Sequence, residues 1–518
     1  MWQDKTPDNT VIDKASSMGQ FLPRHILREL LNFLNMGKHV LVVKGSSGAG
    51  KTTLVLSTLK EWGSNNIYVS TRITPDELYS QYPWVSNIVY RNNILDATRP
   101  KSIRIPFAET IEEFALPETL NVIYKMIETS TVPTTVIIDS WNAIIERLSL
   151  PKNLRGNEEW IRNKLEVLLV DSIKERGANL ILTLEDEKVT KLDYLADGIV
   201  TLHRKELDGR TIREITIEKL RKMEIKQHKY LFTLHNGVFH YFEPFEERHT
   251  KSPQRWQITQ DRPDHFSTGS IDFDTILNGG YARGSYNVFE IDENVSNWAF
   301  MTMIRPTILN FVAQQRGAMI VPIQGNSPEY VKKSLLPYIE EASFNNYARI
   351  ISSKFEAEDK TEKIKKSIDT IFSGEGKGHA PIDISQPYII YSGDSVKDRM
   401  ALWDSVFSLL GKDTKQPILD FTSFDTLEYS IGGNATVAIK EISEAIKKIR
   451  DEGNLGIGVL KPGLTVAQQV KNMADTHFRV AEIDGAYVIY GKKPRTNIYN
   501  IEIDASKGYP ETKLTLVV

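Results

Sequence analysis

Residues Gly45–Thr52 read Gly-Ser-Ser-Gly-Ala-Gly-Lys-Thr, the complete pattern of a phosphate-binding loop. The glycines allow the backbone to wind around a phosphate chain with its N–H groups pointing inward. The Lys51 ammonium would neutralise the β- and γ-phosphates, as a binding and catalytic group, and the Thr52 hydroxyl would coordinate Mg²⁺. We therefore predict ATP and Mg²⁺ as cofactors, with the nucleotide-binding residues Gly45, Ser46, Ser47, Gly48, Ala49, Gly50, Lys51, Thr52 and Thr53.

The segments on either side of this loop support the prediction. Val40–Val43 is an apolar, β-branched run typical of a buried strand, and Thr53–Leu59 has the spacing of a helix. A strand, a glycine loop and a helix in this order are the context in which the motif binds phosphate. The alternative is a glycine-rich turn that matches by chance, and such a turn would not need these flanks.

An acidic residue that ends a second apolar strand is the candidate metal ligand. Thr134–Trp141 contains Val-Ile-Ile followed by Asp139. In P-loop nucleotidases an aspartate at the end of a neighbouring strand holds Mg²⁺ and its water. Many buried strands end in aspartate for other reasons, but beside a complete phosphate-binding loop we predict that Asp139 is a Mg²⁺ ligand together with Thr52.

Composition limits the class of protein. The 518 residues exceed one ordinary core, so two or more domains are expected. Charged residues are 25% and apolar residues 41%, as in soluble globular proteins, and the net charge of −3 gives no general attraction to nucleic acid. The absence of cysteine excludes disulfides and thiol catalysis. No apolar run approaches the length that spans a bilayer, so we predict no membrane contact and a cytoplasmic location.

The order of patterns along the chain predicts two α/β domains. We expect a polar tail over residues 1–20, an ATP-binding domain over 21–242, a linker over 243–265 and a second domain over 266–518. In the first domain, apolar strands alternate with helices, which indicates a parallel sheet covered on both faces. Antiparallel strands with a hairpin at Asn236-Gly237 are expected to close this domain.

The second half repeats the first without its phosphate-binding loop. The strand Tyr286–Glu290 is followed by Ile291–Trp298, which has no glycine or lysine but two acids, so it should repel phosphate. Pro417–Phe421 parallels the strand that ends at Asp139, and Met473–Asp475 parallels an earlier Leu-Ala-Asp sequence. These features predict an internal duplication with one functional and one degenerate nucleotide site.

These motifs together resemble a known family, the KaiC-like branch of the RecA-type P-loop ATPases. The first-half variant looks most like archaeal regulatory proteins related to the gas-vesicle regulator GvpD. The residues that carry the resemblance are Gly45–Thr52, Ser70–Arg72, Pro83–Trp84, Val136–Ser140, Leu195–Gly198 and Lys219–Arg221 and, more loosely, the domain-opening residues Ser267–Gly269, Gly279–Gly280 and Arg283–Ser285.

The resemblance implies two tandem RecA-like domains, ATP with Mg²⁺, and assembly into homo-oligomers with nucleotide at a subunit interface. It also implies that Lys219 and Arg221 reach the γ-phosphate of a neighbouring subunit; the alternative is that both lie on a solvated strand edge. One departure concerns catalysis, because Arg72-Ile73 stands where the family has paired glutamates. Arg72 could contact phosphate instead, and Glu185 is the candidate catalytic replacement, with a plain surface acid as the alternative.

Three functions remain open. The first is a nucleotide-dependent regulator that binds ATP and ADP, hydrolyses ATP slowly if at all, and changes its oligomer or regulatory-protein contacts. The second is a RecA-type recombination or repair ATPase acting on DNA, for which basic clusters such as Lys219–Lys229 and Lys492–Arg495 are the modest support. The third is a motor or assembly accessory protein whose nucleotide only sets its oligomeric state.

Overall fold

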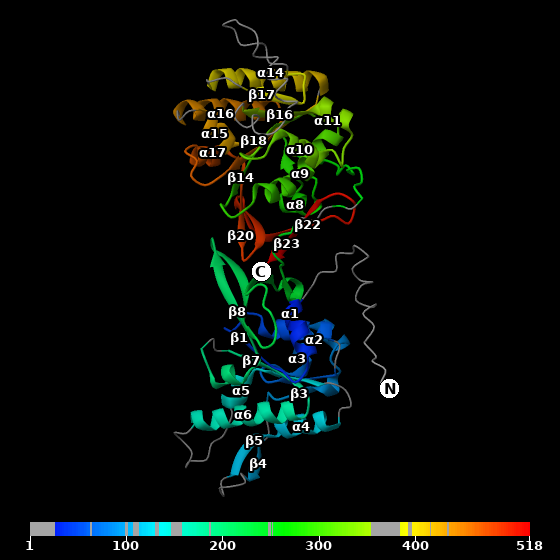
Figure 1. Ribbon diagram of the computed structural model, residues 1–518, viewed down its shortest axis with the longest axis vertical. Coiled ribbons are helices and arrows are strands. Elements are labelled where there is room, and N and C mark those ends of the chain that lie inside the picture. Colours follow the sequence, from blue (N-terminus) through cyan, green and yellow to red (C-terminus); the bar gives the residue numbers. More distant parts are fainter. Residues whose placement is uncertain are drawn as a thin grey trace, which may run out of the picture. The chain divides into compact units, whose positions relative to one another are not determined.

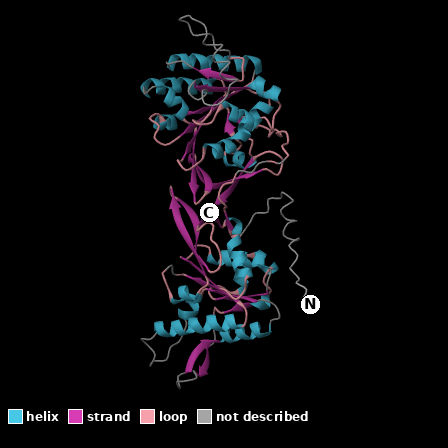
Figure 2. Cartoon of the chain, in the orientation of Figure 1, coloured by secondary structure: helices cyan, strands magenta, loops and turns pink. Residues whose placement is uncertain are grey.

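The computed structural model divides the chain into two compact units (Figures 1 and 2). The first unit spans Pro23–Glu243 and includes Leu516–Val518, and the second spans Pro244–Thr515. The predicted tail, residues 1–20, lies outside the described residues. The structure describes residues 26–62, 65–98, 102–106, 113–129, 134–146, 158–185, 188–246, 250, 252–353, 384–391, 396–414, 416–431 and 435–518.

The first unit is built on a nine-stranded mixed sheet. Its strand order is β11-β10-β9-β8-β1-β7-β6-β2-β3. In this order the strands from β8 through β1 to β3 are parallel to one another, and β9, β10 and β11 each run antiparallel to the strand before them in the chain. Asn236 and Gly237 have φ angles of 58° and 68°, which turn the chain between β10 and β11 as predicted. The strands are β1 (Val40–Gly45), β2 (Asn65–Ser70), β3 (Ile94–Asp96), β6 (Thr134–Asp139), β7 (Asn179–Leu184), β8 (Gly198–Leu207), β9 (Arg210–Leu220), β10 (Lys229–Thr233) and β11 (His240–Tyr241), beside the separate pair β4 (Ser102–Pro106) and β5 (Glu113–Pro117).

Helices cover both faces of this sheet (Figure 1). Alternate residues of β1 show why: Leu41 and Val43 pack with α1, α2 and α3, whereas Val40 and Val42 pack with α4, α5 and α6. The period-two alternation of strand side chains therefore supplies two apolar faces. The helices are α1 (Arg28–Asn35), α2 (Lys51–Trp62), α3 (Pro75–Gln81), η2 (Pro83–Asn87), η3 (Arg91–Asn93), α4 (Glu118–Thr129), α5 (Trp141–Glu146), α6 (Glu158–Glu175), α7 (Lys191–Leu195) and η5 (His235–Gly237).

The second unit has a ten-stranded sheet in the order β17-β16-β15-β18-β19-β14-β20-β21-β22-β23. β14 to β20 are parallel and β20 to β22 antiparallel. The strands are β14 (Tyr286–Ile291), β15 (Ala318–Val321), β16 (Ala348–Ser353), β17 (Tyr388–Tyr391), β18 (Leu419–Ser423), β19 (Leu455–Leu460), β20 (Thr476–Ile483), β21 (Ala486–Lys493), β22 (Arg495–Asp504) and β23 (Glu511–Val517), with the separate pair β12 (His265–Phe266) and β13 (Tyr281–Ala282).

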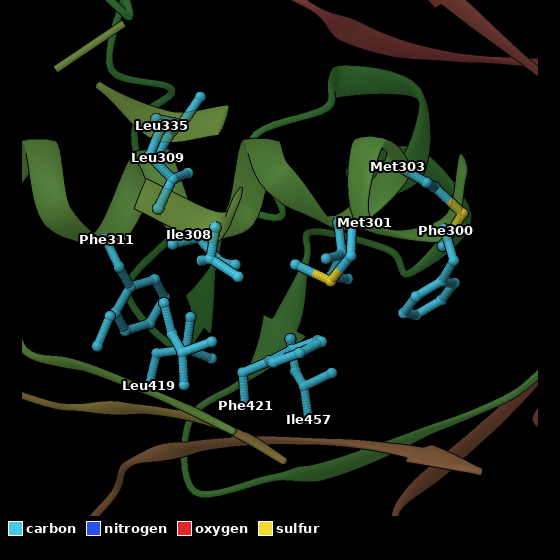
Figure 3. Close-up of a cluster of buried hydrophobic side chains, with 14 of the residues drawn as sticks. Phe300, Met301, Met303, Ile308, Leu309, Phe311, Leu335, Leu419, Phe421 and Ile457 are labelled. Carbon is cyan, nitrogen blue, oxygen red and sulfur yellow. The ribbon is translucent and has the colours of Figure 1, made fainter. Parts of the chain in front are cut away.

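Helices again cover both faces of the second sheet. Figure 3 shows the cluster under α9, in which Phe300 and Ile308 of that helix belong to the same buried core as Phe421 of β18 and Ile457 of β19. α8 to α11 cover this face, and α14 to α17 cover the other. The helices are α8 (Ile271–Ile276), α9 (Asn297–Ala313), α10 (Pro328–Leu335), α11 (Glu341–Tyr347), α14 (Val396–Thr414), α15 (Phe424–Ile431), α16 (Ala435–Asp451) and α17 (Ala467–Met473).

The two sheets have one topology. Reading both from the antiparallel side, β10-β9-β8-β1-β7-β6-β2-β3 matches β22-β21-β20-β14-β19-β18-β15-β16 strand for strand. The predicted α/β fold with a repeated domain is therefore confirmed. No described helix offers a stretch long and apolar enough to cross a bilayer.

The segment predicted as a linker over 243–265 differs from that expectation in its described residues. Trp256 is buried, its backbone N–H donates to Tyr338 O, and its indole N–H donates to Asn310 Oδ1. Gln254 N–H similarly donates to Gly508 O. These contacts make this stretch part of the second unit, since a buried tryptophan supplies core area that a solvated linker would lack.

Candidate nucleotide-binding site

The phosphate-binding loop connects β1 to α2, and its glycines are required by geometry. Gly45, Gly48 and Gly50 have φ angles of 151°, 74° and 107°, values that side-chain-bearing residues rarely adopt. A Cβ on Gly45 would lie 2.7 Å from Leu202 O, and one on Gly50 would lie 2.9 Å from Leu234 Cδ1. Gly48 faces open space. The motif is therefore set by both backbone conformation and close packing.

The two reactive side chains of the motif begin α2. Lys51 is 8% exposed, and its ammonium donates to the carbonyl oxygens of Gly45 (2.7 Å) and Ser46 (2.9 Å). The Thr52 hydroxyl donates to Asp139 Oδ2 at 2.6 Å. The lysine thus lies over the loop, and the two predicted Mg²⁺ ligands are in contact with each other.

The remaining predicted loop residues fall into two groups. Ser46 and Ser47 are exposed, whereas Ala49 is buried and its N–H donates to Ser46 O. Thr53 is also buried, with its hydroxyl 3.2 Å from Tyr82 Oη. Exposed serines on one side and buried residues on the other leave the outer surface of the loop accessible.

Asp139, at the end of β6, is a centre of hydrogen bonds. Besides Thr52, its carboxylate accepts from Tyr68 Oη at 2.7 Å and from Thr183 Oγ1 at 2.5 Å. Burial and the adjacent Asp139 carboxylate raise the pKa of Tyr68. Sequence reasoning missed Tyr68 and Thr183; the available signal was a hydroxyl inside each largely apolar strand, and β2 also carries the Ser70 hydroxyl.

Arg72 and Glu185, which the sequence treats separately, form an ion pair. Arg72 Nε and Nη2 donate to the two oxygens of Glu185, each at 3.1 Å, and Nη2 also reaches Glu146 Oε2 at 3.2 Å. Ser140 Oγ donates to Glu185 Oε1 at 3.1 Å, and Glu185 N–H donates to Asn142 Oδ1. The candidate catalytic acid is therefore held by a guanidinium.

Lys219 and Arg221 lie at the opposite edge of the sheet from the phosphate-binding loop. Lys219 pairs with Ile199 at the start of β8, whereas the loop follows the end of β1. Lys219 Nζ donates to Ala196 O at 2.6 Å, and burial followed by the nearby Arg221 lowers its pKa. Arg221 Nη1 donates to Asp197 Oδ1 at 3.0 Å. In their own unit these cations do not belong to the site around Lys51.

A buried ion pair adjoins the loop and was not anticipated. Lys44, directly before Gly45, is 1% exposed and its Nζ lies 2.6 Å from Asp193 Oδ2. It also donates to Lys188 O at 3.0 Å. Asp193 in turn accepts from Thr190 N–H at the start of α7. The residue that precedes the loop is thereby tied to α7.

Two family models and two relatives match this chain. The model of the GvpD gas vesicle protein P-loop domain matches residues 31–218, and the model of GvpD basic region 2 matches residues 255–518. The chain belongs to the GvpD family. Protein GvpD2 and Protein GvpD1 of Halobacterium salinarum are 26% and 27% identical to it, each alignment covering 95% of this chain and 96% of the relative.

The second unit of this GvpD-family chain has no equivalent of the phosphate-binding loop. The connection between β14 and α9 has the same length as that between β1 and α2, but none of residues 291–297, all of them described, has a positive φ angle. The Ser296 side chain caps α9 by accepting from Ala299 N–H. A side chain therefore occupies the role that a phosphate has at helix N-termini.

Proposed function

We propose that this protein is a regulator of gas vesicle formation that binds ATP with Mg²⁺ in its first unit and changes its oligomer or partner contacts with the nucleotide. The observation that carries the proposal is the contact between Thr52 and Asp139 beside the Lys51 loop. A hydroxyl and a carboxylate oxygen are the protein ligands that Mg²⁺ uses beside phosphate oxygens. The description of the matched family as a gas vesicle protein supplies the biological setting.

The residues present fit a nucleoside triphosphate. Lys51 Nζ is satisfied by the loop carbonyls of Gly45 and Ser46, neutral acceptors that phosphate oxygens can replace with stronger charge-assisted bonds. Gly48 has open space beside it, and the positive end of the α2 dipole at the start of that helix favours an anion. Bound Mg²⁺ would offset the phosphate charge, while Thr52 and Asp139 hold and orient it.

Slow turnover is the second part of the proposal. Arg72 stands where the KaiC-like ATPases that this chain resembles have paired glutamates. The candidate replacement, Glu185, accepts hydrogen bonds from both Arg72 and Ser140. A guanidinium cannot accept a proton from water, so the usual general base is lost at this position whether or not Glu185 is paired. We therefore assign the site to nucleotide-dependent switching rather than rapid hydrolysis.

The position of the distal cations supports the oligomeric part of the proposal. Lys219 and Arg221 are at the edge of the sheet away from the loop of their own unit, so a role at the nucleotide would require a neighbouring subunit. A cation supplied in this way would link bound ATP to subunit contact.

The test is nucleotide binding by the full chain. Calorimetry with Mg²⁺ and a non-hydrolysable ATP analogue should show affinity that Lys51→Ala weakens at least about a hundredfold. The matched control is Asn297→Ala, which changes the corresponding first helical residue of the second unit and should leave affinity unchanged.

Light scattering with ADP, the analogue and ATP, together with phosphate release, then separates the parts of the proposal. A change of mass between ADP and the analogue, with little phosphate released, supports a switch. Absence of binding by the wild-type chain, or full binding by Lys51→Ala, contradicts the nucleotide site itself.

A further inference from the structure

The Arg72–Glu185 ion pair lies at the edge of the sheet where nucleotide would bind. Arg72 follows the end of β2, and Glu185 directly follows Leu184, the last residue of β7. Leu184 lies opposite Lys44 in the parallel β1–β7 pair, so Glu185 follows at the level of Gly45. The carboxyl ends of parallel strands meet at one edge of a sheet. The ion pair is therefore a neighbour of the phosphate-binding loop.

The charges of this cluster are unbalanced and its ion pairs are weakly held. One guanidinium serves two carboxylates, Glu185 and Glu146. The side chains of Arg72, Glu185 and Glu146 are 45%, 37% and 58% exposed, and ion pairs this exposed add little net stability because water competes for both groups. An incoming phosphate would repel the carboxylates and attract the guanidinium, which binds phosphate with the same bidentate geometry.

We propose that Arg72 senses the terminal phosphate of ATP by exchanging Glu185 for it. This inference rests on the proposed nucleotide site. With ADP the Arg72–Glu185 pair stays closed, and with ATP Arg72 turns to the γ-phosphate and releases Glu185. Ser140 Oγ, which follows the Asp139 ligand, remains the partner of the released carboxylate.

The exchange gives the site two states that differ in one ion pair. Glu146 belongs to α5 and loses its guanidinium contact together with Glu185. The end of β7 and the end of α5, where Glu146 lies, would then report whether the third phosphate is present. Arg72 thus has the opposite role from the acid it replaces: it reads the nucleotide instead of activating water.

The experiment measures the affinities of the full chain for a non-hydrolysable ATP analogue and for ADP, both with Mg²⁺, by calorimetry. Arg72→Gln should weaken analogue binding about tenfold and leave ADP binding within about twofold. Glu185→Gln should strengthen analogue binding about threefold, because Arg72 then gives up a neutral amide and not a carboxylate when it turns to the γ-phosphate. Arg91→Gln is the matched control, since Arg91 forms an exposed ion pair with Asp76 at 2.6 Å in the same unit, and should change neither affinity.

Opposite effects of Arg72→Gln and Glu185→Gln on analogue affinity support the exchange, because loss of a merely structural pair would weaken binding in both variants. An unchanged ratio of analogue to ADP affinity in Arg72→Gln, or weaker analogue binding in Glu185→Gln, overturns it. If the wild-type chain binds both nucleotides and only Lys51→Ala abolishes binding, the exchange is wrong and the proposed function stands. If the wild-type chain binds neither nucleotide, both are wrong.

Discussion

The first and second units share a strand order and a way of anchoring their central strand, yet differ where a nucleotide would bind. Asp197 accepts from Val40 N–H at 3.1 Å at the start of β1, and Asp475 accepts from Tyr286 N–H at 2.8 Å at the start of β14. In each unit a cation from a covering helix pairs with this aspartate, Lys174 of α6 in the first unit and Arg450 of α16 in the second. The amino-terminal edge of the sheet is therefore the same in both units, and the divergence is concentrated at the carboxyl edge.

At the carboxyl edge the second unit reverses the charges of the first. The strand registers align Lys44 with Glu290, and the equivalent of the Lys44–Asp193 pair is Glu290–Lys471, with 3.0 Å between its charged atoms. Hydrogen bonding from His477 first, then from Lys471, lowers the pKa of Glu290 to about 2 against the opposing effect of burial. Both units thus keep an ion pair between the central strand and a helix, α7 or α17, but the positive charge lies on the strand in the first unit and on the helix in the second.

The residue proposed as a metal ligand, Asp139, is replaced as well. Leu180 pairs with Val136 and Gly456 pairs with Asp420, so Asp420 corresponds to Val136 and Ser423 to Asp139. Ser423 Oγ donates to Asp425 Oδ1 instead of accepting a threonine hydroxyl. The strand of Pro417–Phe421 does parallel that of Asp139, but its aspartate lies three residues too early to act as a Mg²⁺ ligand.

The largest expected effect tests the reversed ion pair. Lys44→Glu places two carboxylates together where Lys44 is 1% exposed, and should lower the free energy of unfolding of the first unit by about 5 kcal/mol in urea titrations. Adding Asp193→Lys copies the Glu290–Lys471 arrangement and should restore more than half of the loss. The shortfall is about 1 kcal/mol, because Asp193 also caps α7.

The control for this pair is Lys191→Glu, an equal charge change at an exposed position of α7, expected to stay within about 0.5 kcal/mol. If the double variant is no more stable than Lys44→Glu, the two units are not interchangeable at this position, and the sign of the charge beside the loop matters for folding.

A smaller effect is expected from the proposed metal ligand, Asp139, and its counterpart in the second unit, Ser423. Asp139→Ala leaves the buried hydroxyls of Tyr68 and Thr183 without an acceptor and should cost about 3 kcal/mol of unfolding free energy without nucleotide. Ser423→Ala removes one hydroxyl that donates to Asp425 and should cost about 1 kcal/mol. Equal losses in the two variants would show that Asp139 has no special role as a centre of hydrogen bonds.

Features that are contiguous in sequence could be predicted. Gly45–Thr52 is a local pattern, and Asp139 ends an apolar strand, so both follow from neighbouring residues. The alternation of strands and helices likewise predicted the sheet and its helical cover.

Features that depend on strand order could not be predicted. Tyr68 and Thr183 meet Asp139 only because β2 and β7 flank β6, and Lys44 meets Asp193 only because α7 packs beside β1. Arg72 and Glu185 were both candidates, but their pairing is a contact 113 residues apart in sequence. Hydrophobic periodicity specifies elements and not which of them become neighbours.

The smallest expected effect uses Asp420, the acid that the second unit has where the first has Val136. Burial raises its pKa to about 7, against hydrogen bonds from Thr422 and Trp403. The nearby Tyr286, whose pKa burial and Asp420 raise further, stays protonated. Because the folded protein holds the Asp420 proton up to about pH 7 and the unfolded chain releases it near the ordinary aspartate pKa of 3.8, stability should fall as pH rises through that window, by at most about 1.4 kcal/mol per pH unit.

Asp420→Asn should flatten this dependence, measured as the difference between urea midpoints at about pH 5 and about pH 8. Val136→Asn, an amide at the same place in the first unit, controls for burial of a polar group there; it should destabilise at both pH values without changing the wild-type slope. A wild-type midpoint that rises with pH, or an unchanged slope in Asp420→Asn, would mean that the Asp420 proton is not retained by the fold. The asymmetry between the units would then lie only in their loops and ion pairs.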